Sequence, residues 1–107
     1  INNKIISKLK KYNSQSKYIL TTVNPKDKTF EETRYWRGPV WINSNWIIYQ
    51  GMINKDKNFS SLIKNKTLSL LENKKFYEYY NFKNGDCLGA NNFSWSAALY
   101  IDLKLSN

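Results

Sequence analysis

YWRGPVWINSNW, at residues 35–46, joins a dense aromatic cluster to the start of an apolar helical pattern. From Val40 to residue 53, apolar side chains recur on more than one face of a helix. This pattern is typical of a helix that is buried on most sides, and Pro39 suits the first position of such a helix. Because several of these residues are β-branched, a strand is the alternative. The stretch therefore predicts a buried helix that begins beside an aromatic loop.

Three other segments have the apolar spacing of a helix; they are residues 4–12, 58–74 and 93–103. The segment at 58–74 has the clearest apolar stripe, and Asn58 is its predicted N-cap. Asn92 is the predicted N-cap of the last segment. The sequence predicts an all-α fold of roughly four helices.

Two connections separate the predicted helices, and both are rich in aromatic residues. The first follows residue 12 and contains a turn signal at Asn24 and Pro25. The second, residues 76–92, has no helical or strand periodicity and contains a tight-turn signal at Asn84-Gly85. We expect both connections to be ordered loops.

The composition excludes several classes of protein. With 107 residues the chain is about one small domain. Histidine is absent, which excludes a Ser-His-Asp triad and a His-ligated zinc site within this chain. The single cysteine, Cys87, cannot form an internal disulfide. No apolar run approaches the ~20 residues of a membrane span, so no membrane partner is expected.

The net charge of +9 raises the question of a nucleic-acid partner. All but two of the 17 basic residues are lysines, and asparagine, isoleucine and tyrosine are also abundant. These residue types have A/T-rich codons, so genome composition accounts for the charge. The lysines are scattered and lie apart from the aromatic clusters, whereas a stacking surface for single strands needs the two interleaved. We expect no nucleic-acid partner.

Two aromatic segments contain the candidate functional residues of the chain. The first contains Tyr35, Trp36, Arg37 and Trp41. Aromatic faces stack on the apolar faces of sugar rings, and arginine and tryptophan N–H groups donate to hydroxyls. A buried aromatic corner with Arg37 in a salt bridge is the alternative interpretation.

The second segment, FYEYY at residues 76–80, places Glu78 among four aromatic residues. A carboxylate in such surroundings can act as a general base near neutral pH. Alternatively, Glu78 points outward or pairs with Arg37. Glycoside hydrolysis needs two carboxylates that flank the scissile bond, so Glu78 alone supplies half of such a site.

The two segments together resemble a known enzyme family. YWRGPVWINSNW followed by FYEYYNFKNGDCLGANNFSWSAAL is similar to the C-terminal part of glycoside hydrolase family 63, across residues 18–103. Processing α-glucosidase I and mannosylglycerate hydrolase-like enzymes belong to this family. The resemblance implies that residues 1–107 are a C-terminal fragment of one (α/α)6-barrel catalytic domain, and that the remainder of the barrel is their partner.

The resemblance also implies roles for particular residues. Glu78 would be the catalytic general base. Trp36, Arg37 and Trp41 would line the sugar pocket, and Trp95 would close it. We expect these five side chains to line one concave surface, since both segments precede or open helices.

The sequence departs from the family pattern at two turn positions, where Phe82 and Asn84 replace a proline and a threonine. The general acid of the family, an aspartate, lies in an upstream part that is outside this chain. The resemblance implies an inverting α-glycosidase with a small sugar substrate and no metal or organic cofactor. A trehalase, a debranching-type glucosidase and a non-catalytic sugar-binding helical domain are the alternatives.

Overall fold

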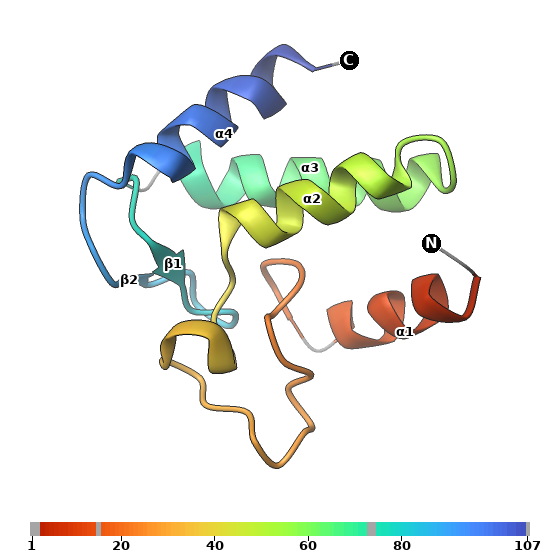
Figure 1. The fold of residues 1–107 in the computed structure, drawn as a ribbon, viewed down its shortest axis with the longest axis horizontal. Helices are drawn as coiled ribbons and strands as arrows, with labels where there is room; N and C mark the ends of the chain where they lie inside the picture. The colour runs from red at the N-terminus through yellow and green to blue at the C-terminus, as the bar shows by residue number, and fades with distance from the viewer. Residues whose placement is uncertain (1–2, 15, 73–74, 107) are drawn as a thin grey trace.

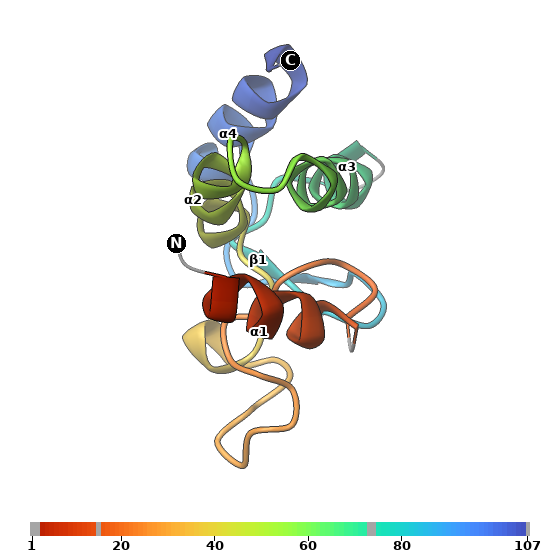
Figure 2. The same cartoon turned by 90° about the vertical axis from the view of Figure 1, so that its right-hand side faces the viewer.

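The computed structural model describes residues 3–14, 16–72 and 75–106. Its helices are α1 (Asn3–Asn13), α2 (Ile42–Met52), α3 (Lys57–Glu72) and α4 (Ser94–Leu105), with a 3-10 turn at Tyr35–Arg37. Two short strands, β1 (Tyr79–Tyr80) and β2 (Cys87–Leu88), form an antiparallel hairpin. Helices α2 and α3 lie side by side, with α4 on one side of the pair and α1 on the other (Figures 1 and 2). The predicted helices are confirmed, except that residues 73 and 74 lie outside the described part of the chain.

The start of α2 differs from the prediction. The helix begins at Ile42, and Pro39 and Val40 lie in an extended stretch before it. Val40 exchanges two backbone hydrogen bonds with Tyr80, at 2.8 and 2.9 Å, and forms a second bridge with Thr21. These long-range bonds satisfy the Val40 backbone in an extended conformation, so Pro39 is not the first residue of the helix.

Both predicted N-caps are wrong. Helix α3 begins at Lys57, and Asp56 takes the capping role because its Oδ1 accepts a hydrogen bond from the Phe59 N–H at 3.0 Å. Asn58 therefore lies inside the first turn. Helix α4 begins at Ser94, and Asn92 has a φ of 54° outside it.

The segment at 76–92 is more regular than the prediction of a loop. Tyr79 pairs with Leu88 and Tyr80 pairs with Cys87 across the β1–β2 hairpin. The predicted turn at Asn84-Gly85 is confirmed, since Gly85 has a φ of 76° and donates its N–H to the Asn81 carbonyl at 2.9 Å. The hairpin lies at the end of the helical layer where α2 and α4 begin (Figure 1).

Two apolar clusters hold the elements together. One joins α1 to α2 and α3 around Tyr49, Met52 and Ile63. The other joins the hairpin to α3 around Tyr80 and Leu70. None of the described helices combines the length and apolar character that crossing a membrane requires.

Large apolar side chains remain exposed on the outer faces of α2 and α4: Ile47 is 61%, Ile101 57% and Leu105 79% exposed. Large exposed apolar side chains favour association. We expect the 107-residue chain, expressed alone, to bind a hydrophobic dye and to aggregate. An Ile47→Lys/Ile101→Lys variant should bind less dye with an unchanged helical circular dichroism spectrum. A soluble monomer that melts cooperatively without binding dye would contradict this prediction.

Candidate functional site

Stacked aromatic rings form the centre of the candidate site. The Trp36 and Trp41 ring centroids are 3.6 Å apart with an interplanar angle of 14°. Trp41 also stacks on Tyr79, which follows Glu78 in the chain, with centroids 5.1 Å apart. Trp41 is only 2% exposed, whereas Trp36 is 43% exposed. In this chain Trp41 therefore supports the other rings, and the ring of Trp36 is open to a ligand.

The aromatic loop is held by its own backbone. Trp41 donates its indole N–H to the Tyr35 carbonyl at 3.0 Å, and Glu31 donates its backbone N–H to the Arg37 carbonyl at 2.8 Å. A Cβ at Gly38 would lie 2.2 Å from the Glu31 carbonyl oxygen, so only glycine allows this close approach. The residues on both sides of the exposed Trp36, Tyr35 and Arg37, are therefore held in place by hydrogen bonds.

Arg37 has an acidic partner within the same loop. Its Nη1 lies 3.3 Å from Glu31 Oε2, and Arg34 reaches the same oxygen at 3.4 Å. The structure thus shows Arg37 in a salt bridge, with Glu31 and not with Glu78. Since the Arg37 side chain is 61% exposed, this ion pair is weak and leaves the guanidinium accessible.

Glu78 is half-buried and attached to the loop that follows β2. Its backbone N–H donates to the Ala90 carbonyl at 2.9 Å, and its Oε1 accepts the Ala90 N–H at 3.2 Å. Gly89, with a φ of 73°, makes room for the carboxylate: a Cβ there would lie 2.7 Å from Glu78 Oε1. Oε2 makes no hydrogen bond to another described residue, so it is free to accept one from a ligand or water.

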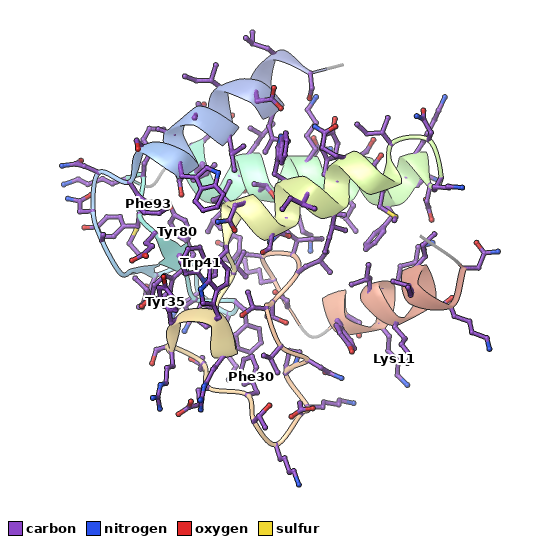
Figure 3. The ribbon with its side chains drawn as sticks, in the orientation of Figure 1. Lys11, Phe30, Tyr35, Trp41, Tyr80 and Phe93 are labelled. Atoms are coloured by element: carbon purple, nitrogen blue, oxygen red, sulfur yellow. The ribbon has the colours of Figure 1, made fainter. Side chains whose placement is uncertain are left out.

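Phe93 connects the stacked rings to the start of α4. Its ring makes an edge contact with Trp41 at 6.4 Å and a tilted contact with Trp95 at 6.5 Å. Phe93 donates its backbone N–H to the Phe76 carbonyl at 2.7 Å. Trp95 is 51% exposed in the first turn of α4. Tyr35, Trp41 and Phe93 of this cluster gather at the same end of the molecule as the core residue Tyr80 (Figure 3).

Ring contacts thus join Trp36, Trp41 and Trp95 into one cluster, with Glu78 attached through its neighbour Tyr79. Arg37 lies on the same turn but outside the ring contacts that the described residues make. The expected concave surface stays a prediction. Among the described residues, no three His, Cys, Asp or Glu side chains gather to hold a metal ion.

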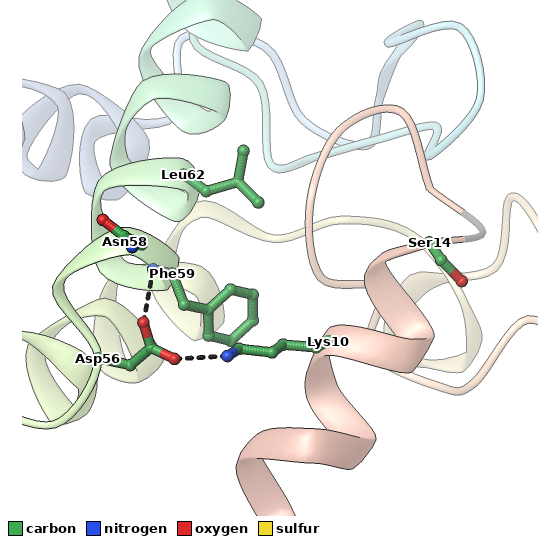
Figure 4. A pocket seen from close by; sticks show the side chains of 6 residues that line it. All are labelled: Lys10, Ser14, Asp56, Asn58, Phe59 and Leu62. Carbon is green, nitrogen blue, oxygen red and sulfur yellow. Dashed lines mark hydrogen bonds and ion pairs between the residues drawn. The ribbon is translucent and has the colours of Figure 1, made fainter.

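A separate cavity of about 550 Å³ lies between α1 and the start of α3 and contains none of the predicted site residues. Lys10 and Asp56 form an ion pair of 2.5 Å in its wall, and Lys10 lies over the Phe59 ring (Figure 4). The hydrogen bond from Lys10 holds the pKa of Asp56 below its usual range. The two charges compensate each other, and their ion pair links α1 to the residue that precedes α3.

Several polar residues that support the site have no strong sequence signal. Burial raises the pKa of Tyr80 to about 12, and its hydroxyl donates to the Lys75 carbonyl and accepts the Tyr77 N–H. Ser96 donates its hydroxyl to the Tyr77 carbonyl at 2.8 Å. Asn45 is fully buried, and its side chain makes three hydrogen bonds.

Known proteins with a similar sequence and fold identify the family of this chain. Residues 2–96 match the model of the mannosylglycerate hydrolase MGH1-like glycoside hydrolase domain. The chain is 42% identical over 94 residues to mannosylglycerate hydrolase from Thermus thermophilus, covering 85% of this chain and 22% of that protein. It is 28% identical over 85 residues to glucosylglycerate hydrolase from Mycolicibacterium hassiacum, covering 78% and 19%.

A solved structure shows the same fold. The crystal structure of the GH63 mannosylglycerate hydrolase from Thermus thermophilus, in complex with Tris and D-glycerate, superposes with a TM-score of 0.87 at 37% identity. The match covers 91% of this chain and 24% of that one. The helices of this chain are thus the C-terminal portion of an (α/α)6 barrel, as the resemblance implied. The chain belongs to the family of mannosylglycerate hydrolase MGH1-like glycoside hydrolase domains.

Proposed function

We propose that this chain is part of the catalytic domain of an inverting α-glycosidase that acts on a terminal α-linked sugar of a small glycoside. Hexosyl glycerates are the first candidate substrates, because two relatives are named for hydrolysing them. The observation that carries the proposal is the attachment of Glu78 to the Ala90 N–H beside the stacked Trp36 and Trp41 rings.

Each predicted residue has a task that its geometry supports. Glu78 takes a proton from water through the oxygen that no described residue occupies, while an aspartate outside this chain protonates the leaving oxygen. Trp36 and Trp95 offer exposed ring faces to the sugar, and Trp41 supports Trp36 from beneath. Arg37 reaches sugar hydroxyls from the same turn as Trp36.

The remainder of the barrel is the proposed partner of the exposed apolar faces. The chain spans about a quarter of the relative of known structure. Ile47, Ile101 and Leu105 would be covered by helices that this chain does not supply.

A substrate screen of the complete enzyme tests the proposal. Mannosylglycerate, glucosylglycerate, trehalose and nigerose-type disaccharides should be compared for release of free sugar. Turnover of a hexosyl glycerate supports the proposal, and turnover of trehalose alone supports the trehalase alternative. Sugar binding without turnover of any glycoside would support a non-catalytic binding domain and contradict the proposal.

The complete enzyme should invert the anomeric configuration. Inversion needs room for a water between base and sugar, so Glu78 and the acid should be ~6.5–9.5 Å apart. NMR of the first-formed product checks this: an α-glycoside should release the β-sugar. Initial release of the α-sugar would mean that the second carboxylate attacks carbon directly and that Glu78 has another role.

A further inference from the structure

We propose that Glu32 is a positioning residue for Glu78, which it fixes through Asn81 and the turn of the β1–β2 hairpin. The inference rests on the proposed function, because that function makes Glu78 the base. Glu32 lies 46 residues before Glu78, in the long connection that precedes the aromatic loop. A direct hydrogen bond joins the two segments: Asn81 Nδ2 donates to Glu32 Oε2 at 2.9 Å.

Asn81 is the centre of the hairpin turn. It is 3% exposed, and its Oδ1 accepts the Lys83 N–H at 2.8 Å and the Asn84 N–H at 3.3 Å. Its backbone donates to the Asp86 carbonyl and accepts the Gly85 N–H, both at 2.9 Å. The orientation of one buried amide therefore sets the path of the turn, and Glu32 fixes that orientation from outside.

The hairpin turn sets the position of the Glu78 carboxylate. It joins β1 to β2 and so determines which residues face each other across the hairpin. That register puts Gly89 opposite Glu78 and brings the next residue, Ala90, to the carboxylate, where the Ala90 N–H binds Glu78 Oε1. A shift of the turn would move this donor, and displacement of a reacting group by ~1 Å can lower a rate about 100-fold.

The hydrogen bond from Asn81 is the main polar contact of Glu32. It holds the pKa of the Glu32 carboxyl below its ordinary value. Lys83 also approaches Glu32, with Nζ 3.4 Å from Oε1, but the two side chains are 65% and 42% exposed, so this pair contributes little. The edge contact between Phe30 and Phe82, with centroids 5.2 Å apart, keeps the two segments together when the hydrogen bond is lost.

A charge swap in the complete enzyme tests the inference. Asn81→Asp keeps the acceptor for the Lys83 and Asn84 N–H groups but puts two carboxylates face to face. It should lower kcat about 10- to 100-fold with little change in KM. Adding Glu32→Gln restores a donor, now on residue 32, and should recover most of kcat. Glu32→Gln alone, which keeps an acceptor, and the control Lys83→Met should stay near wild type.

Hydrogen–deuterium exchange of peptides covering residues 81–90 gives a readout that does not need turnover. Exchange should be faster in Asn81→Asp and return toward wild type in the double variant. Failure of the double variant to recover kcat, or a lowered melting temperature with kcat unchanged, would overturn the positioning role. If the wild type hydrolyses no glycoside, the proposed function fails, and unchanged exchange in Asn81→Asp would separately overturn the link between Glu32 and the hairpin.

Discussion

Glu78→Gln should remove nearly all glycoside hydrolysis from the complete enzyme while sugar binding persists. The amide keeps the shape of the side chain, and its oxygen can still accept the Ala90 N–H that Glu78 Oε1 accepts at 3.2 Å. It cannot take a proton from water, and the loss of a general base costs about 10²- to 10⁴-fold in rate. Single-turnover kinetics and calorimetric titration with the sugar measure the two effects separately.

Glu72→Gln is the matched control for this change. Glu72 is exposed at the end of α3, where it pairs with Lys104 at 2.7 Å. Its substitution should leave kcat unchanged, since exposed pairs contribute little. Should Glu78→Gln keep more than about a tenth of wild-type kcat, which is above the range expected for loss of a base, another residue must activate the water.

Gly89→Ala should produce the second largest loss of activity. Gly89 has a φ of 73°, which is unfavourable for alanine, and a Cβ there would lie 2.6 Å from the Tyr79 ring and 2.7 Å from Glu78 Oε1. The methyl group would displace the carboxylate or the ring that stacks on Trp41. We expect kcat to fall by about 100-fold, as for other small displacements of reacting groups, and the melting temperature to fall as well.

Gly51→Ala separates this local effect from a general effect of glycine replacement. Gly51 is exposed within α2, where alanine is favoured over glycine by about 0.5–1 kcal/mol. The melting temperature of the Gly51→Ala enzyme should rise slightly, and its kcat should stay unchanged. Equal activity of the Gly89→Ala and wild-type enzymes would show that the loop after β2 does not fix Glu78.

The helices could be predicted because their signal is local. Apolar spacing of three and four residues places α1, α2, α3 and α4 within about two residues of their observed bounds. The errors arise where distant residues compete for the same backbone. Val40 is extended because Tyr80 bonds both of its backbone groups, and nothing near Val40 in the sequence indicates that partner.

In the candidate site, too, residue types can be predicted from the local sequence, whereas contacts between distant residues cannot. The residue types at Trp36, Trp41 and Glu78 suit sugar chemistry but also suit a buried aromatic corner, and only the family resemblance favours the first and gives each residue a role. Their mutual geometry depends on Tyr79 stacking against Trp41 across 38 positions of the chain. Glu32 has no signal at all, because a single acidic residue in a long connection looks like any exposed side chain until its partner Asn81 is seen.

Asn45 acts as a substitute for a neighbouring strand. Its Oδ1 accepts the Leu20 N–H and its Nδ2 donates to the Leu20 carbonyl, both at 3.0 Å, so one planar amide reproduces the paired bonding of a sheet. Its Nδ2 also donates to the Trp41 carbonyl at 2.9 Å, at the start of α2. Aspartate has the same outline but would set an acceptor against the Leu20 carbonyl. Hydrogen-bond polarity, and not size, therefore decides between asparagine and aspartate at position 45.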